Sequence, residues 1–227
     1  MKFFKKFNNH NLYKEYIRND YELPNISLIL SDKYIHYEQK LYDTKVDYLE
    51  CTGTQYIDTH INVDSSYSIE ITMAASNSSG MAIGGRINMT QPDMHIGYPS
   101  EGKIRFKTNK HLKMYNFEEN VFYDIKLLNN EFYFDNIKQT PISISNYQQS
   151  PFVLDKTYYL FACNTNGTPI YGNKIKIRKV KIINTNNEIL FDAYAVRKNG
   201  IGYMYDKVSK QLFGNLGSNN FIIGTDI

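Results

Sequence analysis

The fold class is decided by the stretch Val196–Asn215, which reads VRKNGIGYMYDKVSKQLFGN. A polar turn at Asn199-Gly200 precedes a short aromatic strand, and a tight loop leads into a second apolar strand that ends at Gly214-Asn215. Asn-Gly between alternating apolar residues is the strongest short-range signal for a β-hairpin. The stretch therefore predicts a hairpin with both strands half buried.

The same period-two pattern recurs upstream, from about Lys45 onward. Apolar side chains alternate with polar ones, and turn residues interrupt the pattern every ten or so positions. The clearest alternating sets are Tyr67, Ile69, Ile71 and Met73; Met94, Ile96 and Tyr98; and Tyr123, Ile125 and Leu127. No helical stripe of useful length follows Pro24. This pattern predicts an all-β sandwich of two antiparallel sheets over roughly residues 47–224.

Two local features refine this expectation. The continuous apolar run Tyr158–Cys163 predicts a strand that is covered on both faces. Further on, the apolar phase changes between Ile177 and Val180, which predicts a β-bulge near Arg178-Lys179.

The first 44 residues differ from the rest and are expected to form an N-terminal arm, with the main domain at 45–227. Apolar residues at helical spacing predict a short helix, which cannot be stable alone. They are the candidate partner-binding residues Phe3, Phe4, Phe7, Leu12, Tyr13, Tyr16 and Ile17. Packing on its own domain and docking on another protein are equally good interpretations. After Pro24, residues 26–37 predict a small hairpin that extends a sheet of the main domain or pairs with a neighbouring subunit.

Charge and cysteine content limit the partners. A net charge of +3 with scattered Lys and Arg predicts no nucleic-acid partner, and no apolar segment reaches membrane-spanning length. Met1–Phe7 is basic like the start of a signal peptide, but Asn8–Asn11 is polar where an apolar segment should follow. We therefore expect no secretion signal, and reduced thiols at Cys51 and Cys163.

The sequence offers no catalytic residues, no metal site and no cofactor motif. Five histidines lie in unrelated contexts, none near a cysteine or in a nucleophile elbow. Asp93 and His95 share one strand face, but alternation leaves open whether that face points inward or outward. Glu118-Glu119 lies in a loop, away from any strand that could pair two carboxylates for glycoside hydrolysis. Sugar binding is harder to exclude, because 20 tyrosines offer apolar ring faces; most of them, however, occupy alternating core positions.

Sequence blocks at both ends of the predicted sandwich resemble the same protein family. Tyr48–Thr59, YLECTGTQYIDT, resembles the opening block of concanavalin A-like (LamG-type) jelly-roll domains, with Cys51 and His60 where the family has Ser and Gly. The blocks 160–167, 174–177 and 191–206 are similar to later strands of that family. The matching residues form turns and hairpins, and the resemblance covers residues 47–224.

The resemblance implies a non-enzymatic display or adhesion module, as is common in virion proteins of tailed phages. The Leu23-Pro24-Asn25 segment and the short hairpin that leads into Leu41-Tyr42-Asp43 also resemble the head-proximal part of fibre proteins of crAss-like phages. We accordingly expect a virion structural protein, a head fibre or decoration made in the host cytoplasm. Its arm would dock on other virion proteins and support a homo-oligomer, expected to be a trimer. The alternative is a carbohydrate-binding adhesion module for host glycans, and a third hypothesis is a divergent glycan hydrolase.

Overall fold

The computed structural model describes residues 26–31, 34–39, 41–76, 80–88, 92–100, 102–108, 111–128, 131–146 and 151–227. These ranges contain strands, turns and irregular segments, and no helix. Consequently they include no helix that is long and apolar enough to cross a bilayer. The chain divides into two compact units, residues 1–43 and residues 44–227.

In the first unit the expected hairpin is present. Strands β1 (Ile26–Ser31) and β2 (Tyr34–Gln39) pair antiparallel from Ile26↔Gln39 to Ser31↔Tyr34. They form a two-stranded sheet of their own, and the expectation that the hairpin extends a sheet of the main domain stays a prediction. Pairing with a neighbouring subunit stays a prediction. The expected helix lies outside the described residues.

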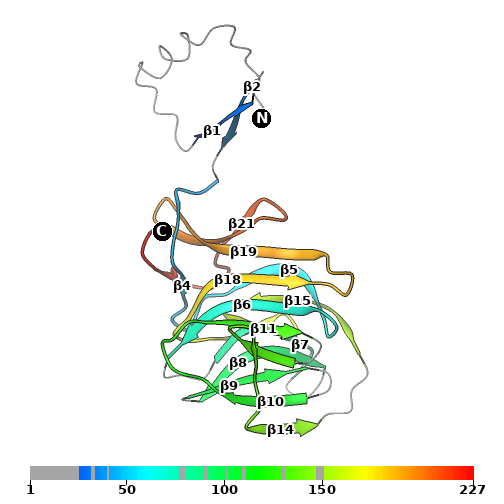
Figure 1. The fold of residues 1–227 in the computed structure, drawn as a ribbon. Coiled ribbons are helices and arrows are strands. Elements are labelled where there is room, and N and C mark those ends of the chain that lie inside the picture. Colours follow the sequence, from blue (N-terminus) through cyan, green and yellow to red (C-terminus); the bar gives the residue numbers. More distant parts are fainter. Residues whose placement is uncertain are drawn as a thin grey trace. The chain divides into compact units, whose positions relative to one another are not determined.

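The second unit is a sandwich of two sheets (Figure 1). One sheet has nine strands, and its pairings are antiparallel except for β16 with β7. In order across the sheet they are β14 (Ser143–Asn146), β10 (His111–Asn116), β9 (Lys103–Lys107), β8 (Asp93–Ser100), β7 (Gly80–Arg86), β15 (Val153–Leu160) and β5 (Ile57–Asp64). Strands β16 (Ala162–Thr165) and β17 (Thr168–Tyr171) attach beside β7.

The other sheet has eleven strands, all paired antiparallel. Its order is β13 (Ile137–Lys138), β12 (Glu131–Phe134), β11 (Tyr123–Leu128), β6 (Ser68–Ala75), β18 (Ile175–Ile183), β19 (Ile189–Lys198), β20 (Ile201–Asp206) and β21 (Gln211–Phe213). Three short strands complete it: β3 (Thr44–Lys45), β4 (Leu49–Glu50) and β22 (Ile222–Ile223). The all-β sandwich expected from the sequence is thus confirmed.

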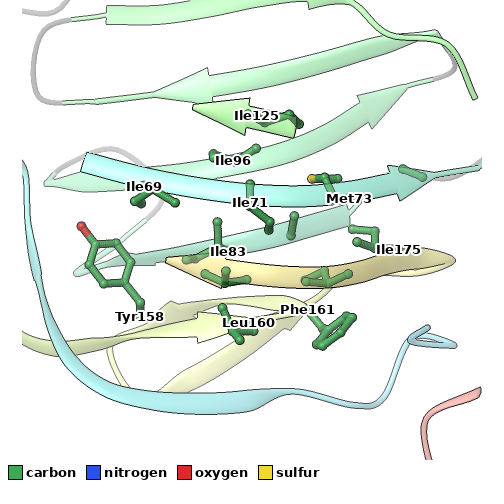
Figure 2. Close-up of a cluster of buried hydrophobic side chains, with 14 of the residues drawn as sticks. Ile69, Ile71, Met73, Ile83, Ile96, Ile125, Tyr158, Leu160, Phe161 and Ile175 are labelled. Carbon is green, nitrogen blue, oxygen red and sulfur yellow. The ribbon is translucent and has the colours of Figure 1, made fainter. Parts of the chain in front are cut away.

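The core lies between the facing sides of the two sheets. Figure 2 shows apolar side chains from both sheets meeting there, among them Ile71 of β6, Ile83 of β7 and Leu160 of β15. Apolar residues of the predicted alternating strands, such as Ile69 and Met73, are fully buried. Burying one such side chain stabilises the fold by about 1.5–3 kcal/mol. The alternating apolar residues therefore account for the packing of the two sheets against each other.

The deciding stretch at 196–215 folds as predicted. Strands β19 and β20 pair across Lys198↔Ile201, and β20 pairs with β21 across Met204↔Phe213. Asn199 and Gly200 both have positive φ, 50° and 76°, which is the backbone of a two-residue type I′ turn. The Asn-Gly pair therefore specifies the turn by its conformational preference.

One predicted feature of the strands is confirmed and another is wrong. The register of β18 against β6 shifts between Ile177 and Lys179, where the bulge was expected. The run Tyr158–Cys163 is buried throughout, but it is not one strand, because Phe161 has φ 61° and separates β15 from β16. Its backbone is held there by two hydrogen bonds, Phe161 N–H to the Ala82 carbonyl and Gly172 N–H to the Phe161 carbonyl, each 2.7 Å.

His60 also adopts a backbone that favours glycine. Its φ is 60°, a left-handed conformation within β5, at the position where the resembled family has Gly. The His60 N–H donates to Asp58 Oδ1 at 2.8 Å, and this hydrogen bond supports the left-handed conformation of His60.

Candidate functional site

The residues that the sequence predicts for partner binding are not among the described ones. Phe3, Phe4, Phe7, Leu12, Tyr13, Tyr16 and Ile17 all lie outside the described residues. Docking through the arm therefore stays a prediction. In the sandwich, two groups of polar side chains stand out.

The first group is a buried charge cluster on the outer face of the nine-stranded sheet, the face turned away from the other sheet. Alternation along β8 points Met94 and Ile96 into the core, which settles the question left open by the sequence: Asp93 and His95 point outward. Both are nevertheless buried. Asp93 Oδ2 lies 3.0 Å from Lys107 Nζ and 3.6 Å from an Arg86 terminal nitrogen.

These contacts set the ionisation of Asp93. Burial alone would raise the pKa of this carboxyl group, but hydrogen bonds and charges from His95 and Lys107 outweigh it, so the pKa is lowered. Arg86 is oriented in turn by Thr165, whose hydroxyl oxygen accepts from Arg86 Nε at 2.8 Å. The carboxylate is therefore ionised and placed among cationic side chains.

The neighbours of His95 determine its tautomer. Arg105 Nε donates to His95 Nε2 at 3.0 Å, and a guanidinium has no acceptor, so Nε2 carries no proton. The proton is on Nδ1, which lies 2.7 Å from Asp93 Oδ1 and donates to it. Burial lowers the pKa of His95, in agreement with a neutral ring.

Asp93, His95 and Cys163 lie close enough to suggest a metal site, since their ligand atoms fall within 4.8 Å of one another. The chemistry of the site does not fit a cation. Both imidazole nitrogens are used, and burial raises the pKa of the Cys163 thiol to about 12. Arg86 and Lys107 already neutralise the carboxylate. The arrangement is that of a structural ion cluster.

The second group surrounds a cavity of about 630 Å³ at one end of the sandwich. One wall comes from the ends of β9 and β10 in the nine-stranded sheet, and the other from β11, β12 and β13 in the eleven-stranded sheet. Its lining residues are Gly102, Asn116, Phe117, Glu118, Tyr123, Phe134, Asp135, Ile137 and Gln139. The volume is typical of small-ligand sites, about 300–1,000 Å³.

Aromatic rings form the base of this cavity. The Phe117 and Phe134 side chains are buried, and their ring centroids lie 6.1 Å apart. Tyr123 is half-buried and lies 5.1 Å from Phe117 and 5.0 Å from Phe134. Ile137 is 68% exposed at the rim. The cavity therefore presents an apolar surface built from both sheets.

Polar groups complete the rim, and the backbone fixes their positions. Asp135 and Asn136 form the tight turn between β12 and β13, with φ of 49° and 67°. Asp135 Oδ1 accepts from the Asp124 N–H at 2.9 Å, which ties the turn to β11. On the opposite wall, the Gly102 N–H donates to the Tyr98 hydroxyl at 2.8 Å. Besides Tyr123, four side chains that can accept hydrogen bonds thus line the cavity: Asn116, Glu118, Asp135 and Gln139.

Tyr123 links the apolar base to this polar rim. Its pKa is raised, first by partial burial and then by the negative charge of Glu118. The phenol is consequently neutral at physiological pH, and its ring lies beside an acceptor carboxylate.

A smaller groove of about 340 Å³ lies on the outer face of the eleven-stranded sheet. Its lysines each lie against an acid: Lys126 and Lys181 contact Glu70 at 3.6 and 3.5 Å. Lys179 contacts Asp124 at 3.4 Å. Such an alternating ladder is a solvated sheet face, where each pair contributes little. We assign no ligand to it.

Sequence reasoning identified two parts of the cavity without joining them. The loop position of Glu118 and the strand position of Tyr123 were both predicted, but the Asp135-Asn136 turn is separated from Glu118 by two complete strands, β11 and β12. The cavity forms only because β10 and β12, from different sheets, end on the same side. The available signal was the concentration of aromatic residues at Phe117, Phe122, Tyr123 and Phe134 beside acidic turns.

Comparison with known proteins gives structural similarity alone. The sequence matches no protein-family model and no curated protein. Among solved structures, the fold is similar to a Bacteroides ovatus ATCC 8483 protein provisionally described as carbohydrate binding. The TM-score is 0.52 at 12% identity, and the match covers 86% of this chain. It covers 64% of the other chain, so this chain spans less than two thirds of that protein's length. The likeness supports the two-sheet sandwich.

Proposed function

We propose that the sandwich is a non-catalytic carbohydrate-binding module and that its ligand binds in the cavity between β9–β10 and β11–β13. The observation that carries the proposal is the composition of that cavity: an aromatic base of Phe117, Tyr123 and Phe134 below a rim of acceptor side chains. Sugar rings present C–H faces and hydroxyl edges, so they need apolar contact and hydrogen-bond acceptors together. The provisional description of the Bacteroides ovatus protein agrees with this proposal.

Hydrolysis is a weaker hypothesis for the same cavity. Glu118 and Asp135 both line it, and glycosidases use two carboxyl groups. Both, however, are exposed at the rim, whereas a general acid is kept protonated by an apolar setting. Binding without catalysis is therefore the function that the cavity supports best.

The binding proposal is tested by Tyr123→Ala against an array of neutral and acidic oligosaccharides. We expect the full chain to bind a subset of the array and the variant to lose at least tenfold in affinity, because the ring between Phe117 and Phe134 is removed. Tyr133→Ala is the matched control: Tyr133 is also half-buried and precedes Phe134 in β12, but does not line the cavity. Equal binding by both variants, with unchanged melting temperatures, would place the ligand elsewhere.

Display on a virion is our second candidate. It is favoured by the resemblance of residues 48–59 to a domain common in tailed-phage proteins and of residues 23–43 to phage fibre proteins. In this proposal the arm docks on other virion proteins and the module faces outward. Removing residues 1–43 should leave a folded monomer, because the sandwich is a compact unit of its own. The full chain should form an oligomer or bind purified particles. Light scattering that finds the full chain monomeric, together with no particle binding, would contradict the arm's role.

A further inference from the structure

The cavity is acidic as well as aromatic. Glu118 and Asp135 contribute two carboxylates, and none of the described lining residues is Lys, Arg or His. Two lysines near the cavity are paired with an acid outside it: Lys138 and Lys113 lie 3.3 and 3.9 Å from Glu131, which does not line the cavity. A ligand that enters therefore meets negative charge without a compensating cation on the described walls.

Hydrogen-bond chemistry points the same way. Carboxylates are acceptors only, and Asp135 already uses one oxygen on the Asp124 N–H, which fixes its orientation. Sugar hydroxyl groups can donate to such acceptors, and charge-assisted bonds of this kind are the stronger ones. An acidic sugar would instead bring its carboxylate close to Glu118 and Asp135, where like charges repel across a few ångströms.

We infer that this cavity selects uncharged glycans and rejects those that carry carboxylate groups. The inference rests on the proposed function and names the ligand class of that site. The apolar base packs against the C–H face of a neutral sugar ring, and Glu118 and Asp135 accept from its hydroxyls. Electrostatic repulsion supplies the specificity, because discrimination requires a feature that disfavours the competitor.

The experiment compares each neutral ligand with its own acidic form. Cello-, laminari-, manno- and galacto-oligosaccharides are printed in native form and after oxidation of the C6 alcohols to carboxylates. Wild-type protein should bind at least one native form. Its affinity for the oxidised form of that oligosaccharide should be at least tenfold lower, which corresponds to about 1.4 kcal/mol. In the Glu118→Gln/Asp135→Asn variant the discrimination should fall to about threefold or less. Raising the salt concentration to about 0.5 M should weaken discrimination by the wild type, because salt screens exposed charges.

The control variant is Asp155→Asn/Glu188→Gln, which changes the net charge equally at exposed positions outside the cavity. It should discriminate as the wild type does. Oxidised forms that bind as well as native ones, or discrimination that survives in Glu118→Gln/Asp135→Asn, would overturn the inference and leave the proposed function standing. No binding of any form by the wild type would overturn both.

Discussion

Asp93→Asn is expected to lower the free energy of unfolding by about 3–5 kcal/mol, one of the largest effects available in the sandwich. The substitution preserves shape but removes the negative charge from between Arg86 and Lys107, whose side chains are almost completely buried. It also changes the acceptor that holds the Nδ1 proton of His95. Urea denaturation should show a lower midpoint with an unchanged m-value.

The matched control is Asp155→Asn, in which the same chemical change is made at an exposed side chain. Its effect should stay within about 0.5 kcal/mol, as is usual for surface substitutions. If Asp93→Asn differed from the wild type by no more than this control, the cluster would not contribute to stability.

The cluster also predicts how stability depends on pH. Because the pKa of Asp93 is lowered, its stabilisation is fully present above the unfolded value, about 3.9, and is lost as pH falls through the folded value. The pKa of His95 is lowered as well, so below about pH 6.5 the unfolded chain binds the proton first and stability starts to decline. The difference between wild type and Asp93→Asn should therefore narrow below about pH 4.

Local backbone preferences were predictable from sequence. Asn199-Gly200 and Asp135-Asn136 form turns with positive φ, which these residue types adopt readily. The shift in the apolar alternation before Val180 likewise indicates the β-bulge. Phe161 was not predictable, because nothing in a continuous apolar run marks a left-handed residue. Its conformation depends on backbone hydrogen bonds to segments far away in sequence.

The two polar groups were harder to predict, for a different reason. The alternation around Asp93 and His95 indicates two faces but does not say that Arg86 and Lys107 cover the polar one. That information lies in the register between β7, β8 and β9. The cavity likewise depends on which strand ends of the two sheets become neighbours. Sequence periodicity describes single strands, whereas both sites are made by strands that are distant along the chain.

Asp206→Ala is expected to cost about 2–4 kcal/mol, because a buried acceptor of several hydrogen bonds is lost. Asp206 is only 1% exposed and ends β20, within the stretch that decides the fold. Its Oδ1 accepts from the Asp192 N–H at 2.8 Å and the Val208 N–H at 3.2 Å, and its Oδ2 accepts from the Ser209 N–H at 2.8 Å. One carboxylate therefore closes the loop between β20 and β21 and ties it to β19.

A graded series separates acceptor geometry from charge. Asp206→Asn keeps one acceptor oxygen, so it should lose about half as much stability as Asp206→Ala in the same denaturation experiment. Burial alone would raise the pKa of Asp206, but the hydrogen bonds from Ser209, Asp192 and Val208 outweigh it and lower the pKa. Its contribution is thus present above about pH 4 and lost on further acidification. Hydrogen exchange should report faster opening of β20 and β21 in Asp206→Ala, and unchanged exchange there would contradict this account of how the hairpin is held.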